Sequence, residues 1–293
     1  MTGGWQPTVS VVIPVLDGEQ TIGNCIDSLL GLRYPAERVE LRVVDNGSRD
    51  GTAGVLRRYG ERIVRLEEST RGPAAARNAG LRGAGGEVVA FTDADCRVDP
   101  DWLTALVAPL EDPRVGIAGG TIRAIPPASD VERFGEVIHD HRRAIEVFEP
   151  PYAITMNWAS RRTVLEELGG FNERFRRCQD VDLSYRMTQA GYTLTFAPAA
   201  VVYHRNEDRL AGLFREGFTH GFHGVLLLKH HQEFVRAFGH SHLSGQAYIA
   251  IGSRIVDWAR GRDRERSRCD AVFNSGKKAG KLLGSLRFGH LDI

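Results

Sequence analysis

Two aspartates, Asp93 and Asp95, are the side chains of this sequence that most directly suggest chemistry. They follow Val88 to Phe91, an apolar run whose β-branched residues are typical of a buried strand. Their i, i+2 spacing puts both carboxylates on one face of an extended chain, and carboxylates that close repel each other. A hard cation such as Mg²⁺ or Mn²⁺ removes the repulsion and keeps positions open for phosphate oxygens. The pair therefore predicts a metal site, and the alternative is a solvated turn before a helix that starts near Asp99–Trp102.

The segments around these aspartates alternate between strand and helix patterns. Strands are predicted at residues 9–14, 42–45, 63–66 and 88–91, and helices at 22–30, 52–59 and 71–80. Strand and helix in strict alternation are typical of an α/β protein with a doubly wound, mostly parallel sheet. A further strand is predicted at 116–122, one or two helices at 131–148, and a late strand that ends at His204.

Several polar residues come directly after the predicted strands. Asp17, Asp45, Arg71 and the two aspartates share this position, and ligands of such sheets bind at the carboxyl ends of the strands. We therefore expect these side chains to gather at one edge of the sheet. Residues 14–19 do not form G-x-G-x-x-G, and the sequence has no Walker A motif. A dinucleotide-binding Rossmann domain and a P-loop nucleotidase are both disfavoured.

Composition and charge exclude further classes. The 293 residues are 42% hydrophobic and carry a formal net charge of +1, which gives no general case for nucleic-acid binding. The four cysteines form no C-x-x-C pair, which argues against a zinc site and fits a reducing compartment. No signal pattern and no apolar run of about 20 residues is present. These features predict a cytoplasmic protein.

Four ordered blocks give the sequence a specific resemblance. They are residues 11–14 with Asp17, 44–52, 72–80 and 92–95, and similar motifs continue through 169–173 and 179–183 to about His204. The chain thereby resembles glycosyltransferase family 2, the inverting, sugar-nucleotide-dependent enzymes of GT-A fold. The resemblance implies a GT-A catalytic domain at 1–205, with a nucleotide-sugar half at 1–97 and an acceptor-side half at 98–205. A helical C-terminal extension at 206–293 would follow.

The resemblance implies roles for residues that would bind the donor. Pro14 and Asp17 would shape the wall around the nucleotide base, and Asp45 would accept a hydrogen bond from the imide N–H of that base. Arg71 and Arg77 would place positive charge near the diphosphate or the base. The alternatives are that Asp45 is an ordinary turn residue and that Arg77 is a solvated helix residue.

The same resemblance implies the metal ligands. Asp95 would be the principal ligand, Asp93 would contact the ribose or the metal, and His204 would complete the site for Mn²⁺ or Mg²⁺. A histidine at the end of a strand is otherwise usually a surface residue. Four further histidines in the C-terminal part are interpreted as surface residues rather than a metal site: His220, His223, His230 and His231.

On the acceptor side, the resemblance implies that Asp180 is the general base. This sequence has Gln179 where the family usually has a glutamate, and Asp182 would be structural or would assist. Both aspartates also suit the first turn of a helix, where the helix dipole favours negative charge. Trp158 would stack on a sugar face, with a place in the core as the alternative.

The implied reaction is transfer of one sugar, with inversion, from a nucleoside-diphosphate sugar to an acceptor hydroxyl. A UDP-sugar is the default donor, and the acceptor would belong to a glycan, a glycolipid or a secondary metabolite. The Q-x-x-R-W signature of processive relatives is absent after Asp182, which favours single addition. The alternatives are a sugar nucleotidyltransferase and a non-catalytic sugar-nucleotide-binding module. The first would need a basic, glycine-rich loop at 14–19, and the intact aspartates argue against the second.

The C-terminal part differs in character. Apolar residues from Leu213 to Leu226 recur with helical spacing and predict an amphipathic helix. From Arg254 onward, ten Lys/Arg face five Asp/Glu, an excess of five positive charges, with leucines interleaved. This pattern is compatible with peripheral contact of residues 254–293 with the inner face of an anionic membrane, near a lipid-linked acceptor. A solvated helical tail and a homodimer contact are the alternatives.

Overall fold

The computed structural model describes residues 5–126, 128–239 and 264–292. The chain divides into two compact units. Unit 1 comprises Met1–Arg123 and Asp140–His204, and unit 2 comprises Ala124–His139 and Arg205–Ile293. The division predicted from the sequence differs for residues 124–139, which belong to unit 2. Val131 and Phe134 explain this, because they pack in one apolar cluster with Leu213 and Cys269.

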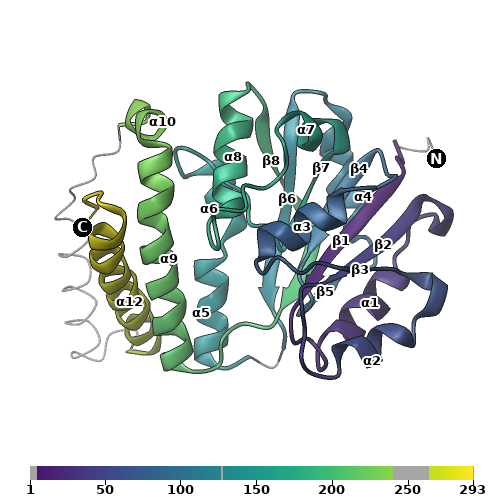
Figure 1. Cartoon of the computed structure of the whole chain (residues 1–293), viewed down its shortest axis with the longest axis horizontal. Coiled ribbons are helices and arrows are strands. Elements are labelled where there is room, and N and C mark those ends of the chain that lie inside the picture. The colour runs from purple at the N-terminus through teal and green to yellow at the C-terminus, as the bar shows by residue number, and fades with distance from the viewer. Residues whose placement is uncertain (1–4, 127, 240–263, 293) are drawn as a thin grey trace. The chain divides into compact units, whose positions relative to one another are not determined.

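Unit 1 is built on an eight-stranded sheet with the order β3-β2-β1-β4-β7-β6-β8-β5 (Figure 1). The strands are β1 (Val9–Val15), β2 (Val39–Asp45), β3 (Val64–Glu67), β4 (Val88–Thr92), β5 (Cys96–Val98), β6 (Val115–Ala124), β7 (Asn157–Arg161) and β8 (Thr193–His204). Its helices are α1 (Ile22–Leu30), α2 (Thr52–Arg57), α3 (Pro73–Leu81), α4 (Trp102–Val107), α6 (His141–Glu146), α7 (Arg162–Glu167) and α8 (Gln179–Gln189). Short 3₁₀ turns lie at Ala36–Arg38, Gly60–Arg62 and Ala108–Glu111.

The predicted strands and helices of the first hundred residues are confirmed, and their four strands pair in parallel. Strand β1 lies between β2 and β4, and β2 also pairs with β3. The rest of the sheet is not parallel, because β4 with β7, β7 with β6, and β5 with β8 are antiparallel. The sheet is therefore mixed rather than mostly parallel.

Pro14 does not end the first strand, as the sequence suggested, but lies within β1 opposite Val44 of β2. Proline has no N–H to donate to a neighbouring strand. The pairing of β1 with β4 runs from Val9 to Val12 and stops before the proline. Pro14 therefore lies beyond the part of β1 that is paired on both sides, and the strand continues to Val15.

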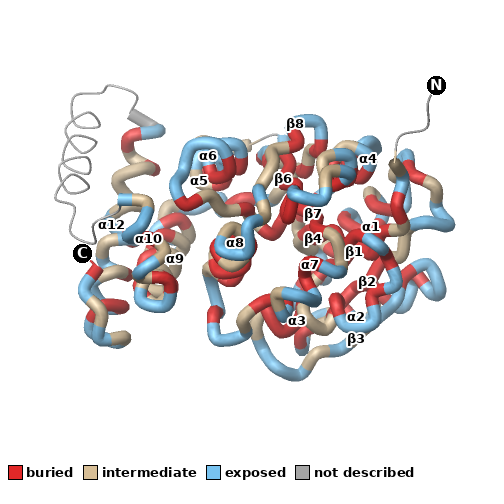
Figure 2. Tube along the Cα trace, turned by 90° about the horizontal axis from the view of Figure 1, so that it is seen from above, coloured by how far each residue is buried: buried red, intermediate tan, exposed pale blue. Residues whose placement is uncertain are grey.

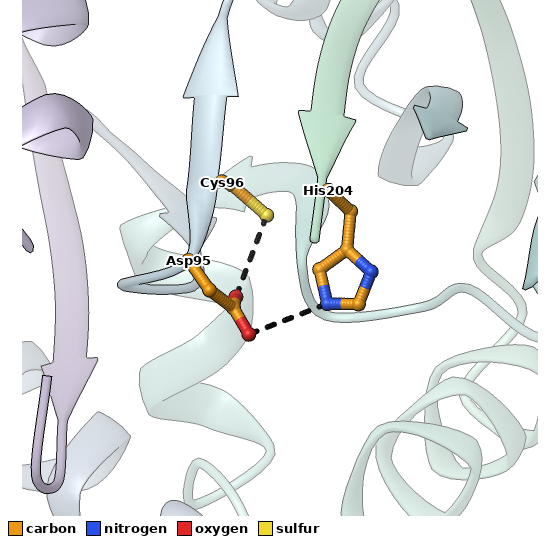
Figure 3. Close-up of side chains that lie close together, drawn as sticks. All are labelled: Asp95, Cys96 and His204. Atoms are coloured by element: carbon orange, nitrogen blue, oxygen red, sulfur yellow. Dashed lines mark hydrogen bonds and ion pairs between the residues drawn. The ribbon is translucent and has the colours of Figure 1, made fainter. Parts of the chain in front are cut away.

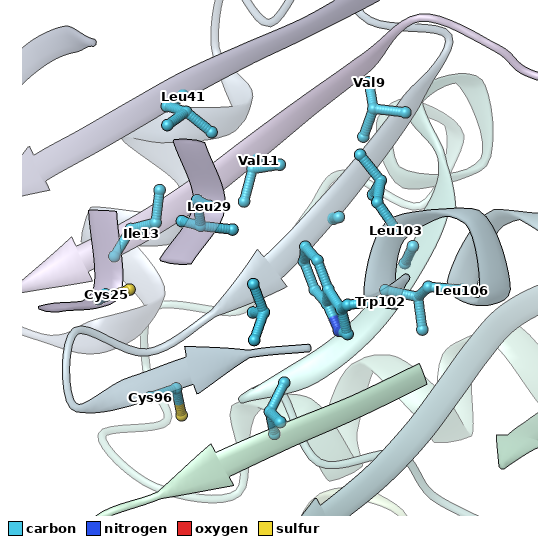
Figure 4. Close-up of a cluster of buried hydrophobic side chains, with 14 of the residues drawn as sticks. Val9, Val11, Ile13, Cys25, Leu29, Leu41, Cys96, Trp102, Leu103 and Leu106 are labelled. Atoms are coloured by element: carbon cyan, nitrogen blue, oxygen red, sulfur yellow. The ribbon is translucent and has the colours of Figure 1, made fainter. Parts of the chain in front are cut away.

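The central strands of the sheet are buried (Figure 2), and apolar side chains pack on both of its faces. Val11 and Ile13 belong to one cluster, which Figure 4 shows together with Cys25 of α1 and Trp102 of α4. Val12, the residue between them, belongs to the cluster on the opposite face. Burial on both faces explains why the strands have continuous apolar sequences instead of alternating ones. Each such side chain stabilises the fold by about 1.5–3 kcal/mol.

Asn157 is a buried polar residue at the centre of this sheet. Its Oδ1 accepts a hydrogen bond of 2.7 Å from Nε1 of Trp102. Its Nδ2 donates to the carbonyl oxygens of Thr121 and Ala200 at 2.8 and 2.9 Å. The amide is thus hydrogen-bonded at both ends, which a buried polar group requires. This pairing links α4 to three strands.

The described part of unit 2 contains the helices α5 (Asp130–Ile138), α9 (Leu210–His230), α10 (Gln232–Ala237) and α12 (Arg264–Phe288). The predicted amphipathic helix is confirmed as α9, and the region predicted to hold one or two helices contains α5 and α6. Helices α9 and α12 lie side by side in Figures 1 and 2. No helix among the described residues is long and apolar enough to cross a membrane.

Candidate active site

The loops that follow β1 and β2 are hydrogen-bonded to each other at the carboxyl edge of the sheet. Asp17 has a positive φ of 53°, and its Oδ1 accepts the N–H of Arg49 at 2.7 Å. The N–H of Asp17 donates to Oγ of Ser48 at 2.9 Å. The loops after β1 and β2 thus lie together at one edge of the sheet, as predicted. Asp17 itself is exposed.

Asp45 ends β2 and is half-buried. Its Oδ1 accepts the N–H of Ser48 at 2.8 Å, which closes the turn after the strand. Within the described part of the chain, Oδ2 has no hydrogen-bond partner. Asp45 therefore shapes the turn after β2, and its role in binding a nucleotide base stays a prediction.

Asn46, which sequence reasoning overlooked, connects the loop after β2 to the loop after β3. Its Nδ2 donates to the carbonyl oxygens of Glu68 and Thr70, both at 2.8 Å, and its Oδ1 accepts the N–H of Gly72 at 2.8 Å. Arg71 adds a weaker bond of 3.4 Å to the carbonyl oxygen of Gly47 and is otherwise exposed. The exposed guanidinium thereby stands at the same edge as Asp45.

Arg77 and Asp93 form an ion pair at this edge. Nη2 of Arg77 donates to Oδ1 of Asp93 at 2.7 Å, and Arg77 is 4% exposed. The guanidinium carbon lies 5.8 Å from the centroid of the Phe171 ring. Nε and Nη1 of Arg77 have no hydrogen-bond partner among the described residues. Arg77 is therefore not a solvated helix residue but a buried cation with donors that a ligand could satisfy.

Asp95, Cys96 and His204 form a second cluster, drawn in Figure 3. The antiparallel pairing of β5 with β8 places Cys96 opposite His204 and so brings residue 95 to the end of β8. Nε2 of His204 lies 3.5 Å from Oδ2 of Asp95, and Sγ of Cys96 lies 4.0 Å from Oδ1. The side chains of Asp95 and His204 are 41% and 13% exposed. Asp93, in contrast, turns to Arg77, so the two aspartates have different partners.

This cluster fits a divalent cation. One carboxylate and one imidazole within 3.5 Å of each other are ligands that Mn²⁺ accepts, and Asp95 is exposed enough to leave room for phosphate oxygens. The thiol of Cys96 is a less suitable ligand, because burial and then the charges of Asp95 and Asp93 raise its pKa well above the usual range. The same causes raise the pKa of the Cys25 thiol, whose Sγ lies 3.5 Å from the carbonyl oxygen of Asp93.

Asp180 lies in the first turn of α8, and Cys178 before it has a positive φ of 63°. Its Oδ2 accepts the N–H of Thr155 at 3.3 Å, and its Oδ1 accepts the N–H of Val181 at 2.9 Å. Burial and then the charge of Asp180 raise the pKa of the nearby Tyr152 phenol. The carboxylate is thus held by two backbone amides and is only partly buried, which is a suitable state for a proton acceptor.

Asp182 is not a residue of the acceptor side in this structure. Its side chain has no exposed surface, and its Oδ2 accepts the Nε–H of Arg186 at 2.9 Å. Nη1 and Nη2 of Arg186 donate to the carbonyl oxygens of Leu168 and Gly170 at 2.6 and 2.7 Å. The pair holds α8 to the turn after α7, so the structural alternative applies to Asp182.

Trp158 does not face a sugar either. It is fully buried, and its ring lies 4.7 Å from that of Phe91 and 5.9 Å from that of Phe171, measured between centroids. Strand β7 carries it between β4 and β6, where both of its neighbours are strands. The aromatic cluster is core packing, which was the alternative considered from the sequence.

Comparison with solved structures identifies the fold. The mannosyltransferase PcManGT from Pyrobaculum calidifontis, solved with GDP-Man and Mn²⁺, matches 96% of this chain and 87% of its own length with a TM-score of 0.71 at 23% identity. TarS 1–349 from S. aureus, solved with UDP, matches 97% of this chain and 92% of its own with a TM-score of 0.56 at 17% identity. The chain therefore has the GT-A fold.

Comparison of sequences identifies the family. The model of Glycosyl transferase family 2 matches residues 10–169. The glycosyltransferase AglE of Haloferax volcanii is 32% identical over 204 residues, which are 68% of this chain and 67% of AglE. The pre-mycofactocin glycosyltransferase of Mycobacterium tuberculosis is 29% identical over 235 residues, 76% of this chain but 48% of that protein. The chain belongs to glycosyltransferase family 2, and it is a glycosyltransferase.

Proposed function

We propose that the protein transfers one sugar, with inversion, from a nucleoside-diphosphate sugar to an acceptor hydroxyl, and that it depends on a divalent metal. The observation that carries the proposal is the arrangement in the turn between the carboxyl end of β4 and the start of β5. There, one aspartate pairs with the buried Arg77 and the other, two residues on, pairs with His204. Positive charge and metal ligands thus stand together beside the loops expected to hold a nucleotide.

The donor is proposed to bind along the loops after β1, β2 and β3. Oδ2 of Asp45 would accept a hydrogen bond from the imide N–H of the base. The base would lie against a wall formed by Pro14 and Asp17. Arg71 would contact the diphosphate, and the buried guanidinium of Arg77 would place positive charge near the diphosphate or the base. Uracil and guanine both have an imide N–H. We take a UDP-sugar as the default, and the donor panel below includes GDP-sugars because PcManGT was solved with GDP-Man.

Asp95 and His204 are the residues that would hold Mn²⁺ or Mg²⁺, and Asp93 would contact the ribose or the metal. A bound divalent cation supplies positive charge that offsets the charge on the departing diphosphate. Arg77 donates a hydrogen bond to Asp93 and fixes the direction of that carboxylate. Because Arg77 is already held in place, it does not have to move when negative charge develops on the departing diphosphate.

Asp180 is proposed to take the proton from the acceptor hydroxyl. The acceptor oxygen forms its bond to the anomeric carbon, the bond from that carbon to the diphosphate oxygen breaks, and the diphosphate leaves with the electron pair.

The test is release of nucleoside diphosphate from a panel of UDP-, GDP- and dTDP-sugars, with Mn²⁺, Mg²⁺ or EDTA. The variant is Asp95→Ala, and Asp101→Ala serves as a matched control because Asp101 is an exposed aspartate that pairs with Arg33 and lies outside the loops after β1, β2 and β3. We expect metal-dependent release from one donor, lost in Asp95→Ala and kept in the control. If no donor is hydrolysed and none binds in calorimetry, the proposed donor site is wrong. Binding without hydrolysis would mean that an acceptor is obligatory, and lipid-linked sugars would then be added.

A further inference from the structure

The C-terminal helix α12 has an apolar face that is turned away from its neighbour α9. Leu282, Leu283 and Leu286 are 58%, 50% and 77% exposed, and Leu291 beyond the helix end is 58% exposed. Ala279 is also exposed, so the spacing 279, 282, 283 and 286 forms one stripe along the helix. Exposed leucines are ordinary when scattered, but a contiguous row of them marks an interaction site. We call these residues the leucine stripe.

The packing of α12 on α9 fixes the direction of this stripe. A Cβ atom added at Gly276, Gly280 or Gly284 would collide with a backbone carbonyl of α9, belonging to Phe214, Phe218 and Phe222 in turn. The difference in residue number between each glycine of α12 and its carbonyl partner in α9 is constant, so the two helices run parallel in a single register. Backbones in such close contact leave no room for α12 to rotate and bury its leucines. The stripe is therefore a fixed surface feature of unit 2.

The charges around the stripe are positive. Helix α12 carries seven Lys/Arg and two Asp/Glu. At 100° per residue, Arg287 borders the stripe on one side, where it is exposed, and Lys278 borders it on the other side, where it is half-buried. Burial and the nearby Lys281 lower the pKa of Lys278, so these lysines repel one another. Lys281 has its own partner in Asp292, at 2.7 Å.

This combination selects one kind of occupant. A second copy of the chain, packed stripe to stripe, would bring like-charged rims together, which is unfavourable. An anionic lipid surface offers apolar contact for the leucines and opposite charge for the rims. We propose that the leucine stripe of α12 inserts into an anionic membrane surface and anchors the protein peripherally. Residues 254–263, part of the segment predicted for this contact, lie outside the described residues.

Vesicle co-sedimentation tests this proposal. The full chain is mixed with phosphatidylcholine vesicles, with or without phosphatidylglycerol, and the double variant Leu282→Asp/Leu286→Asp is compared with wild type. Leu30→Asp is the matched control, because Leu30 of α1 is 41% exposed and lies in unit 1. We expect wild type and control to bind anionic vesicles, the double variant to bind at least tenfold more weakly, and neutral vesicles to capture little of any of them.

Two outcomes would overturn the proposal. One is equal binding of wild type and the double variant to anionic vesicles. The other is a wild-type dimer in light scattering that the double variant loses, with no binding to vesicles, which would make the stripe a contact between two copies. Circular dichroism of the double variant gives the folded fraction, and binding is expressed per folded molecule. Vesicle binding requires no turnover, so its result is independent of the proposed reaction.

A different observation carries a second inference, which concerns the segment before β7. Three consecutive amides of this segment donate to three side chains: Ala153 to Oγ of Ser184 at 3.0 Å, Ile154 to Nε2 of His141 at 2.9 Å, and Thr155 to Oδ2 of Asp180 at 3.3 Å. Ser184 in turn donates to the carbonyl oxygen of Asp180 at 2.8 Å. The segment is thereby attached to the helix that carries the proposed base.

His141 is built into this arrangement. It is 2% exposed, and its Nδ1 lies 2.8 Å from the carbonyl oxygen of Gly120. Because Nε2 accepts the Ile154 N–H, the ring proton is on Nδ1 and is donated to Gly120. A Cβ at Gly119 would lie 2.6 Å from the ring atoms Cε1 and Nε2, so only glycine lets the imidazole lie against the strand. The fit of ring and glycine fixes where Ile154 can be.

We infer that His141 is a positioning residue: it fixes the Ile154 amide and, through the next residue, the Thr155 N–H that orients the Asp180 carboxylate. This inference rests on the proposed role of Asp180. A glutamine at position 141 can place an acceptor near the site of Nε2, whereas an asparagine reaches only the site of Nδ1. His141→Gln should therefore retain the function that His141→Asn loses.

The experiment measures turnover, nucleoside diphosphate affinity and amide hydrogen exchange of the 151–157 peptide in the two variants. We expect His141→Asn to lower kcat at least tenfold with donor affinity unchanged and faster exchange, and His141→Gln to recover most of both. Gly119→Ala should resemble His141→Asn, because its Cβ displaces the ring. Equal losses in both variants, or unchanged exchange in His141→Asn, would overturn the inference. Faster exchange without a change in kcat would mean that His141 holds the segment but that the proposed role of Asp180 as the base is wrong.

Discussion

Replacement by asparagine should affect turnover at one aspartate of α8 and stability at another, two residues further on. Asp180 is half-buried and held by two backbone amides, whereas Asp182 is fully buried against Arg186. We predict that Asp180→Asn removes most turnover and leaves the fold intact. Asp182→Asn should weaken the fold and leave the turnover of each folded molecule nearly unchanged.

The magnitudes follow from these contacts. An asparagine cannot take the acceptor proton, and loss of a general base lowers turnover by about 10²–10⁴-fold. Loss of the carboxylate charge in the first helical turn lowers stability by about 0.3–1 kcal/mol. At position 182, breaking a buried ion pair costs about 3–5 kcal/mol. Arg186 is 23% exposed and keeps its bonds to Leu168 and Gly170, so we expect about 1–3 kcal/mol, in the range of one lost charged hydrogen bond.

The assay combines kcat on the donor found in the panel with urea unfolding of each variant, so that turnover is expressed per folded molecule. If Asp182→Asn is as stable as wild type and as inactive as Asp180→Asn, the assignment of Asp182 to the fold is wrong. If Asp180→Asn keeps wild-type kcat at saturating donor and acceptor, Asp180 is not the base.

The remaining predictions concern the metal cluster, the helix pair and the cysteines. His204→Ala should raise the Mn²⁺ concentration for half-maximal activity at least tenfold, because one metal ligand is lost. Because Asp95 remains, kcat at saturating Mn²⁺ should stay within about tenfold of wild type. An unchanged Mn²⁺ titration would show that His204 is not a metal ligand. Gly280→Ala should destabilise by about 1–3 kcal/mol through overpacking against α9. Gly224→Ala, which has open space, should stabilise by about 0.5–1 kcal/mol; equal urea midpoints would contradict the glycine contact. Cys25 and Cys96 should resist iodoacetamide at pH 8 in the native protein and react after denaturation, because burial raises the pKa of both thiols; mass spectrometry of the labelled peptides gives the answer.

Much of the fold could be predicted from the sequence. The strands before Asp17, Asp45 and Asp93 were predicted from apolar, β-branched runs, because burial on both faces of a parallel sheet leaves a local pattern. The antiparallel half could not be predicted in the same way. The pairing of β7 with β4 and β6 depends on contacts between residues far apart in the chain, and a short run such as 157–161 carries no mark of its direction.

The candidate site divides in the same manner. The motifs drew attention to Asp93, Asp95 and Asp180, whose types and spacing are visible along the chain. The resemblance implied that His204 lies with Asp95, but nothing along the chain indicated that Asp93 would pair with Arg77, which comes from another element. Trp158 and Asp182 were assigned to the acceptor side because of their place in the sequence. Their burial against Phe91 and Arg186 is a property of packing.

The types of chemical group, and the order of the strands and helices that carry them, could be read from local spacing along the chain. Tertiary structure decided which of those groups are exposed, which face one another, and which pair inside the core. His141 is a clear example: its contacts with Gly119, Gly120 and Ile154 join three separate segments of the chain. Burial and partnership are set by distances through space, and spacing along the chain does not encode them.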